Sequence, residues 1–238
     1  MKQNITVFFF SMAFFILHST VAHSQMLINE SDSKQLGYKK VAKYLKNKSK
    51  ENIVYFSELQ PSVNDNSDFD KFYFHTGSYI VNASVQHTWD ICIFESPAKL
   101  WDGKMLGLSC IYNVHSDKIF YGNGQHFDTL ELNQIYFINL RIMRLFNIAT
   151  ALMTTKIDHD QKMVEFTYIE GNKSIGKQTL HLIEINENET KIQHDTFYKS
   201  NSKFRDKRLY SPFHQIAITD LHRKIDEYSG DKYRRTFQ

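Results

Sequence analysis

The sequence is poor in the residues that mark several specialised classes of protein. It has two cysteines, three prolines and nine glycines among 238 residues. Two cysteines are too few for a disulfide-rich scaffold, and so little glycine and proline excludes collagen-like and low-complexity chains. No Gly-x-Ser-x-Gly motif, His-Glu-x-x-His motif, phosphate-binding glycine loop or dinucleotide-binding fingerprint occurs. The motifs therefore point to no catalytic residue, and we expect no metal site and no cofactor.

An excess of charge of one sign is also missing. The chain has 29 basic and 26 acidic residues, a formal net charge of +3. A balance so close to neutral gives no reason to expect nucleic acid as a partner. Hydrophobic residues make up 42% and aromatic residues 14% of the chain, which is enough to bury a sizeable core. Composition leaves the oligomeric state open.

The amino terminus has the layout of a secretory signal peptide. Lys2 precedes a run of 13 mostly apolar residues over 5–17, and the small residues Ala22 and Ser24 stand just before Gln25. A membrane-spanning helix needs about 20 apolar residues, so this run is too short for an anchor. We therefore expect cleavage before Gln25 and a secreted or periplasmic protein without a transmembrane span after signal removal.

Export bears on the two cysteines, because a disulfide can persist in an oxidising compartment. Cys92 and Cys110 both follow the signal peptide and stand among apolar residues. A disulfide between them and two buried free thiols both remain open.

We divide the chain into a signal peptide, an N-terminal extension, a main domain and a tail, over 1–24, 25–70, 71–230 and 231–238. In the extension, apolar residues recur at roughly helical spacing between lysines, namely Leu36, Val41, Tyr44 and Leu45. This pattern predicts a short basic amphipathic helix over 34–46 that lies on the main domain. A contact with a membrane surface is the alternative.

The main domain is dominated by alternating segments typical of strands. We predict eight, over 72–83, 108–115, 118–127, 134–145, 148–157, 162–170, 175–186 and 189–199. Several connections are short and carry turn residues, which indicates antiparallel neighbours. A helix begins after Ser84, and a long one spans 213–228 with Ser211 as its N-cap and Gly230 at its end. The predicted fold is α+β: a curved antiparallel sheet gripping a long C-terminal helix.

Alternation along the strands separates an apolar face from a mixed one. Tyr136, Ile138 and Leu140 share one face, and Arg141 lies on the other. Such strands fit a sheet with one covered side. A strongly curved sheet would leave an apolar pocket under the helix, whereas a filled core would show the same pattern.

Polar residues within these strands are candidates for ligand contacts. If the connection 186–189 were a symmetric four-residue turn, His181 and His194 would sit directly opposite one another and could share a metal or act as a proton relay. A cross-strand pair on the wet face is the alternative. Arg141 could clamp a carboxylate or phosphate, or could simply face water. His214 and His222, eight residues apart on the last helix, form no obvious pair.

Three stretches resemble the START-like, helix-grip superfamily: 79–84 with Trp89, 176–182 with 189–192, and the helix over 213–228. The resemblance covers about 72–229 and implies an elongated cavity for an apolar molecule between sheet and helix. Residues expected to contact that molecule are Arg141, Tyr168, His181, His194, Phe213, Ile216 and Ala217. The function that follows is binding of a hydrophobic small molecule or lipid. A cyclase or hydrolase using cavity histidines and a filled-core interaction module are the alternatives, since fold alone does not fix function.

Overall fold

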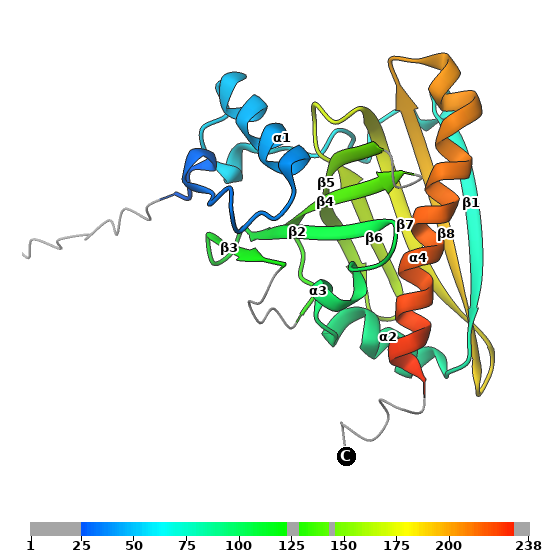
Figure 1. The fold of residues 1–238 in the computed structure, drawn as a ribbon. Helices are drawn as coiled ribbons and strands as arrows, with labels where there is room; N and C mark the ends of the chain where they lie inside the picture. Colours follow the sequence, from blue (N-terminus) through cyan, green and yellow to red (C-terminus); the bar gives the residue numbers. More distant parts are fainter. Residues whose placement is uncertain (1–24, 123–128, 143–145, 231–238) are drawn as a thin grey trace, which may run out of the picture.

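One large antiparallel sheet organises the chain (Figure 1). The structure, a computed structural model, describes residues 25–122, 129–142 and 146–230. The expected signal peptide over 1–24 and the expected tail over 231–238 lie outside the described residues. No helix in the described part of the chain is both long and apolar enough to cross a membrane.

Eight strands form the sheet, in the spatial order β1-β8-β7-β6-β5-β4-β2-β3. Their bounds are β1 Tyr73–Val81, β2 Leu106–Asn113, β3 Lys118–Tyr121, β4 Gln134–Ile142, β5 Phe146–Asp158, β6 Met163–Tyr168, β7 Ser174–Asn186 and β8 Glu189–Ser200. Every neighbouring pair is antiparallel. A strand forms at each of the eight predicted places, although residues 123–127 and 143–145 of two predicted strands lie outside the described residues. The predicted class, a curved antiparallel sheet with a long C-terminal helix, is confirmed.

The described part of the chain has four α-helices around this sheet: α1 Lys39–Lys50, α2 Val85–Phe94, α3 Pro97–Leu100 and α4 Ser211–Ser229. Figure 1 shows α4 along the inner face, with α2 and α3 near its carboxy-terminal half. The Ser84 hydroxyl accepts the backbone N–H of His87, so the predicted cap of α2 is confirmed. The first helix begins later than predicted, because Gly37 adopts a φ of 68° that ends the preceding turn.

The start of α4 differs from the prediction. Helical structure continues from a π-helical turn over Arg205–Tyr210 directly into α4, so Ser211 lies inside a helical run. Its hydroxyl instead lies 3.1 Å from the hydroxyl of Tyr198. The predicted N-cap at Ser211 is wrong because the Ser-Pro pair that typically starts a helix is here preceded by a wider turn. Gly230 does stand at the C-cap.

The inner face of the sheet carries the larger core. Inward positions alternate along β8, where Thr190, Ile192, His194, Thr196 and Tyr198 are buried. These positions join Ile138, Leu152, Phe166 and Leu180 from the other strands and Leu221 and Ile225 from α4. The apolar stripe of α4 therefore packs on the inner face, as amphipathic helices do.

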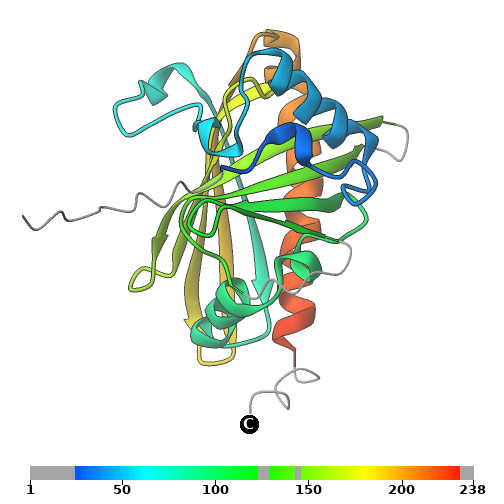
Figure 2. The same ribbon diagram turned by 90° about the vertical axis from the view of Figure 1, so that its left-hand side faces the viewer.

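The outer face is covered as well, over β2, β4 and β5. We call residues 25–63 the N-terminal segment; it crosses this part of the sheet and includes α1 (Figure 2). Phe56 inserts between Tyr112 and Phe137, with ring centroids 5.1 and 5.7 Å away. The expectation of one covered side is wrong here, because β2 is buried at every position. Near-continuous burial is typical of strands covered on both faces.

The two cysteines belong to different cores. Cys92 lies on α2 in the inner core, and Cys110 lies on β2 in the outer core. Both are buried free thiols, so of the two alternatives, a disulfide or two free thiols, the structure shows the free thiols. Burial raises the pKa of the Cys92 thiol to about 12, which keeps it protonated and unreactive.

Candidate functional site

A cavity of about 230 Å³ lies between the inner face of the sheet and α4. Its walls are mainly apolar and come from the α3 end, β2, β4 and α4: Trp101, Leu106, Ile138, Leu140, Phe213 and Leu221. Concave, mostly apolar walls with a few polar groups are typical of small-molecule sites. The volume is below the range of about 300–1,000 Å³ usual for such sites, so it favours a small occupant.

A polar cluster borders one part of this cavity. Gln178 on β7, His194 on β8 and His214 on α4 all contribute to its wall. The Oε1 atom of Gln178 lies 2.8 Å from Nε2 of His194 and 3.2 Å from Nε2 of His214. His222, also on α4, places its Nε2 atom 3.2 Å from Nδ1 of His194. Three elements thus meet through one amide oxygen and three imidazole rings.

Burial keeps these imidazoles uncharged. It is the main cause that lowers the pKa of His194 well below its usual range, with the neighbouring His214 and His222 adding to it. Burial also lowers the pKa of His214 to about 3 and that of His222 to about 4. At neutral pH the cluster therefore presents hydrogen-bonding groups without net charge.

Two tyrosines add a second polar pair to the wall. Tyr168 on β6 and Tyr210, just before α4, hydrogen bond through their hydroxyls. Tyr210 also stacks on Tyr198, with ring centroids 3.5 Å apart, and on His214, with centroids 5.2 Å apart. One hydroxyl donates and the other accepts, so this pair adds a further polar group to the wall beside the amide of Gln178.

The predicted contact residues divide into two groups. Tyr168, His194, Phe213 and Ala217 line the cavity, whereas Arg141, His181 and Ile216 do not. Ile216 is next to a lining residue on α4, but its own side chain is 48% exposed. The helix therefore turns Ala217 toward the sheet and Ile216 toward solvent.

The predicted pairing of His181 with His194 is wrong. His194 stands opposite Leu180, and His181 stands opposite Gln193. The two-residue turn after Asn186 would have given the predicted register, but an irregularity between Glu184 and Asn186 shifts it by one residue. A shift of one residue sends a side chain to the other face of the sheet. His181 consequently lies outside the cavity.

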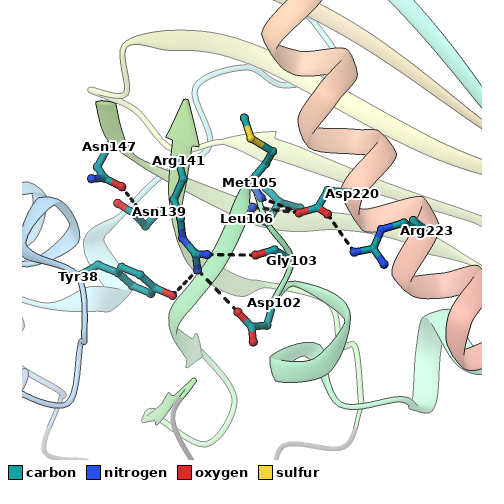
Figure 3. A network of polar contacts seen from close by, with 10 residues as sticks. All are labelled: Tyr38, Asp102, Gly103, Met105, Leu106, Asn139, Arg141, Asn147, Asp220 and Arg223. Atoms are coloured by element: carbon teal, nitrogen blue, oxygen red, sulfur yellow. Dashed lines mark hydrogen bonds and ion pairs between the residues drawn. The ribbon is translucent and has the colours of Figure 1, made fainter. Parts of the chain in front are cut away.

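Arg141 lies away from the cavity, on the outer side of β4 (Figure 3). Its Nη1 atom donates to the carbonyl of Gly103 over 3.2 Å, and Nη2 donates to the hydroxyl of Tyr38 over 2.9 Å. Asp102 adds an ion pair at 3.8 Å. Arg141 therefore joins the N-terminal segment to the loop before β2 and does not serve as the ligand clamp considered above.

On the other side of that loop, Asp220 fastens α4 (Figure 3). Its Oδ2 atom accepts the backbone N–H of Met105 over 2.8 Å and that of Leu106 over 3.3 Å. A side chain on Gly103 would meet this carboxylate, because an added Cβ would lie 1.9 Å from it. Met105 and Leu106 line the cavity, so the contact holds the helix over one end of it.

The sequence reasoning missed Gln178 and Tyr210 and dismissed His214 and His222. Period-two alternation could have found Gln178, because it shares the inward face of β7 with Leu180. The two α4 histidines meet His194 on β8 and do not meet each other. Only the packing of α4 against β8 brings these three rings together.

No protein-family model matches the chain, and no curated protein matches it. Among solved structures, a truncated norcoclaurine synthase from Thalictrum flavum is similar, with 14% identity and a TM-score of 0.50 over 71% of this chain and 99% of that chain. A conserved protein from Geobacillus kaustophilus has 16% identity and a TM-score of 0.47 over 66% of this chain and 95% of that one. Likeness at this identity concerns the fold alone, and it confirms the helix-grip arrangement of a curved sheet and a long C-terminal helix that the sequence motifs suggested.

Proposed function

We propose that the protein binds a hydrophobic small molecule in the cavity between α4 and the sheet. The carrying observation is a cavity of about 230 Å³ whose walls are mainly apolar, with a neutral cluster around Gln178, a pair of tyrosines, Lys173 and Arg205 among its polar lining groups. Burying ligand hydrocarbon there stabilises the complex by about 25 cal/mol per Å² of apolar surface. The size favours a small lipid-like or aromatic molecule over a lipid with two long chains.

We further propose that this binding takes place outside the cytoplasm. The support is the sequence of residues 1–24, with its basic start, short apolar run and small residues before Gln25. Expression of the full chain with its native leader, followed by mass measurement of the secreted protein, tests this. We expect a chain that begins at Gln25; a chain that keeps Met1 inside the cell would contradict it.

A second candidate is an enzyme that performs proton transfer in the same cavity. The observation in its favour is that His194 and His214 both border the cavity. A general base works best with a pKa near the working pH, and burial lowers the pKa of His214 to about 3. Binding is therefore the function that the site supports better, and the cavity also argues against a filled-core interaction module.

Two neighbouring substitutions on α4 test the binding proposal. Ala217→Trp adds a bulky ring at a lining position, whereas Ile216→Trp adds the same ring at an exposed position one residue earlier. With ethylbenzene as the probe in isothermal titration calorimetry, we expect Ala217→Trp to weaken binding at least tenfold and Ile216→Trp to leave it unchanged. Equal binding by all three proteins would contradict the proposal.

Recovery of the probe separates binding from catalysis. We expect ethylbenzene and acetophenone to be released chemically unchanged after prolonged incubation with the protein, as measured by mass spectrometry. A product that forms with the wild type and fails to form with Ala217→Trp would favour the enzyme.

A further inference from the structure

The polar cluster at the cavity wall is built around a single amide. Gln178 is only 6% exposed, and its Oε1 atom faces two imidazole nitrogens at once. Its other terminal atom, Nε2, has no hydrogen-bond partner among the described residues, and Gln178 borders the cavity. One end of the amide is therefore occupied by protein, and the other is available to whatever fills the cavity.

The orientation of the amide follows from counting donors and acceptors. An amide oxygen only accepts, so His194 and His214 both donate to it from Nε2. Neutral His194 then has a lone pair at Nδ1, which accepts the Nε2–H of His222. Every imidazole N–H of these three residues thereby has an acceptor.

The two unpartnered buried atoms of the cluster agree with this assignment. They are Nδ1 of His214 and Nδ1 of His222, and in this arrangement both carry lone pairs. Turning the amide around would reverse each hydrogen bond and place a proton on both atoms. Buried N–H groups without a partner are rarer and more costly than unpaired acceptors. The hydrogen-bond count therefore directs the amide N–H of Gln178 toward the cavity.

The charge of the neighbouring groups determines which ligand groups can accept a hydrogen bond from the Gln178 amide N–H. The three imidazoles are neutral, because burial lowers the pKa of each one. Among the residues that the structure describes, no acidic one lines the cavity, and the charged ones that do are Lys173 and Arg205. The Arg205 guanidinium donates to the carbonyl of Lys173 and to Asn201. The Nε atom of Arg205 is buried without a partner, but the groups bonded to the Gln178 side chain are the neutral His194 and His214. A carboxylate at Gln178 itself would therefore lose its hydration with no cation among the groups that contact this amide, which is costly.

We propose that the ligand is an uncharged, largely apolar molecule that places a carbonyl oxygen, as in a ketone or ester, against the Nε2–H of Gln178. This proposal rests on the proposed function and adds the chemical class of the ligand to it. The three histidines position the amide through its oxygen, and the amide contacts the ligand. Apolar walls supply affinity, and the amide donor orients the carbonyl end of the ligand toward Gln178.

Three probes of similar size test the proposal: acetophenone with a carbonyl group, ethylbenzene with none and benzoate with a charged carboxylate. Calorimetric titration at pH 7.5 measures each affinity for the wild type and for Gln178→Met, which removes the donor together with the oxygen that accepts from His194 and His214 and nearly keeps the volume. We expect the substitution to weaken acetophenone about five- to tenfold and ethylbenzene less than twofold. Benzoate should bind the wild type at least tenfold more weakly than acetophenone.

A spectroscopic readout keeps the test decisive if Gln178→Met disturbs the fold. The carbonyl stretching band of ¹³C-labelled acetophenone bound to the wild type should lie at lower wavenumber than in cyclohexane, because a donated hydrogen bond weakens the C=O bond. An unshifted band, an equal loss of acetophenone and ethylbenzene binding in a folded Gln178→Met protein, or tighter binding of benzoate would each overturn the inference. If none of the three probes binds the wild type, the proposed function itself fails.

Discussion

On the outer face of the sheet, the N-terminal segment with α1 packs over β4 and β5 and closes a core, whereas on the inner face a cavity beneath α4 is bordered by the same strand β4. Ile135 and Phe137 point outward into the core closed by Phe56, and Ile138 points inward to the cavity. A straight helix cannot follow a curved sheet along its whole length, so space remains beneath α4. Similar strand alternation thus gives a filled core on one face and a ligand-sized space on the other.

We expect the largest stability losses from truncating two isoleucines of β4, one on each face of the sheet, and comparing these losses tests whether the two faces are packed differently. Ile135 and Ile138 are 0% and 1% exposed, but only Ile138 borders the cavity. We expect Ile135→Ala to lower the free energy of unfolding by about 4 kcal/mol and Ile138→Ala by about 2 kcal/mol, because a residue that borders empty space has fewer contacts to lose. Urea unfolding measures both, and equal losses would show that the two faces are packed alike.

We expect acidic pH to lower the stability of the fold through the buried histidines of the inner face. Folded His222 and His214 have pKa values lowered to about 4 and about 3 by burial, against about 6.5 in the unfolded chain. The unfolded state therefore takes up protons first, so this stability is complete above pH 6.5 and is lost as the pH falls toward 4 and 3. At pH 5 we expect a loss on the order of 2 kcal/mol for each histidine.

Urea unfolding between pH 7.5 and pH 5 measures this effect, because protonated carboxylates contribute equally to the wild type and to a histidine variant. His222→Gln should remove part of the pH dependence, whereas the same substitution at the exposed His115 should leave it unchanged. An unaltered pH dependence in His222→Gln would mean that this imidazole does not stay neutral in the folded state.

Substituting Asp220, which links α4 to the loop before β2, tests whether α4 needs this contact to stay over the cavity. Asp220→Asn keeps one oxygen acceptor for Met105 and Leu106 but removes the charge. We expect a loss of about 1–2 kcal/mol in the free energy of unfolding and faster release of acetophenone. Stopped-flow displacement measures the release rate. An unchanged rate would show that α4 is held over the cavity by other contacts.

We expect the smallest loss of stability from breaking the hydrogen bond between Tyr38 and Arg141 on the outer side of β4. This substitution also serves as a control for those on the inner face. Tyr38→Phe removes the hydroxyl that accepts from Arg141. Because that hydrogen bond lies on the outer side of β4, we expect a loss of about 1 kcal/mol in the free energy of unfolding and unchanged acetophenone affinity. A change in ligand affinity would show that the N-terminal segment acts on the cavity through Arg141.

Local patterns in the sequence were enough to predict the fold. Period-two alternation and turn residues predicted all eight strands, and the spacing of Phe213, Leu221 and Ile225 predicted the last helix. The motifs at Trp89 and after Gly176 pointed to the helix-grip arrangement. These features depend on residues close together in the chain, which is why sequence alone sufficed.

The candidate site was only partly predictable, because it depends on register and on helix placement. One irregularity near Ile185 decides that His194 faces the cavity and that His181 does not. Gln178 and His214 meet only because α4 crosses β7 and β8 at that height. The space under α4 is set by sheet curvature, and a filled core would have shown the same alternation.

Native mass spectrometry of the gently purified protein tests the central claim most directly. The account predicts that the wild type and Ile216→Trp take up acetophenone as a single added mass and that Ala217→Trp does not. If all three proteins show the same unliganded mass at saturating acetophenone, the space between α4 and the sheet is not a binding site.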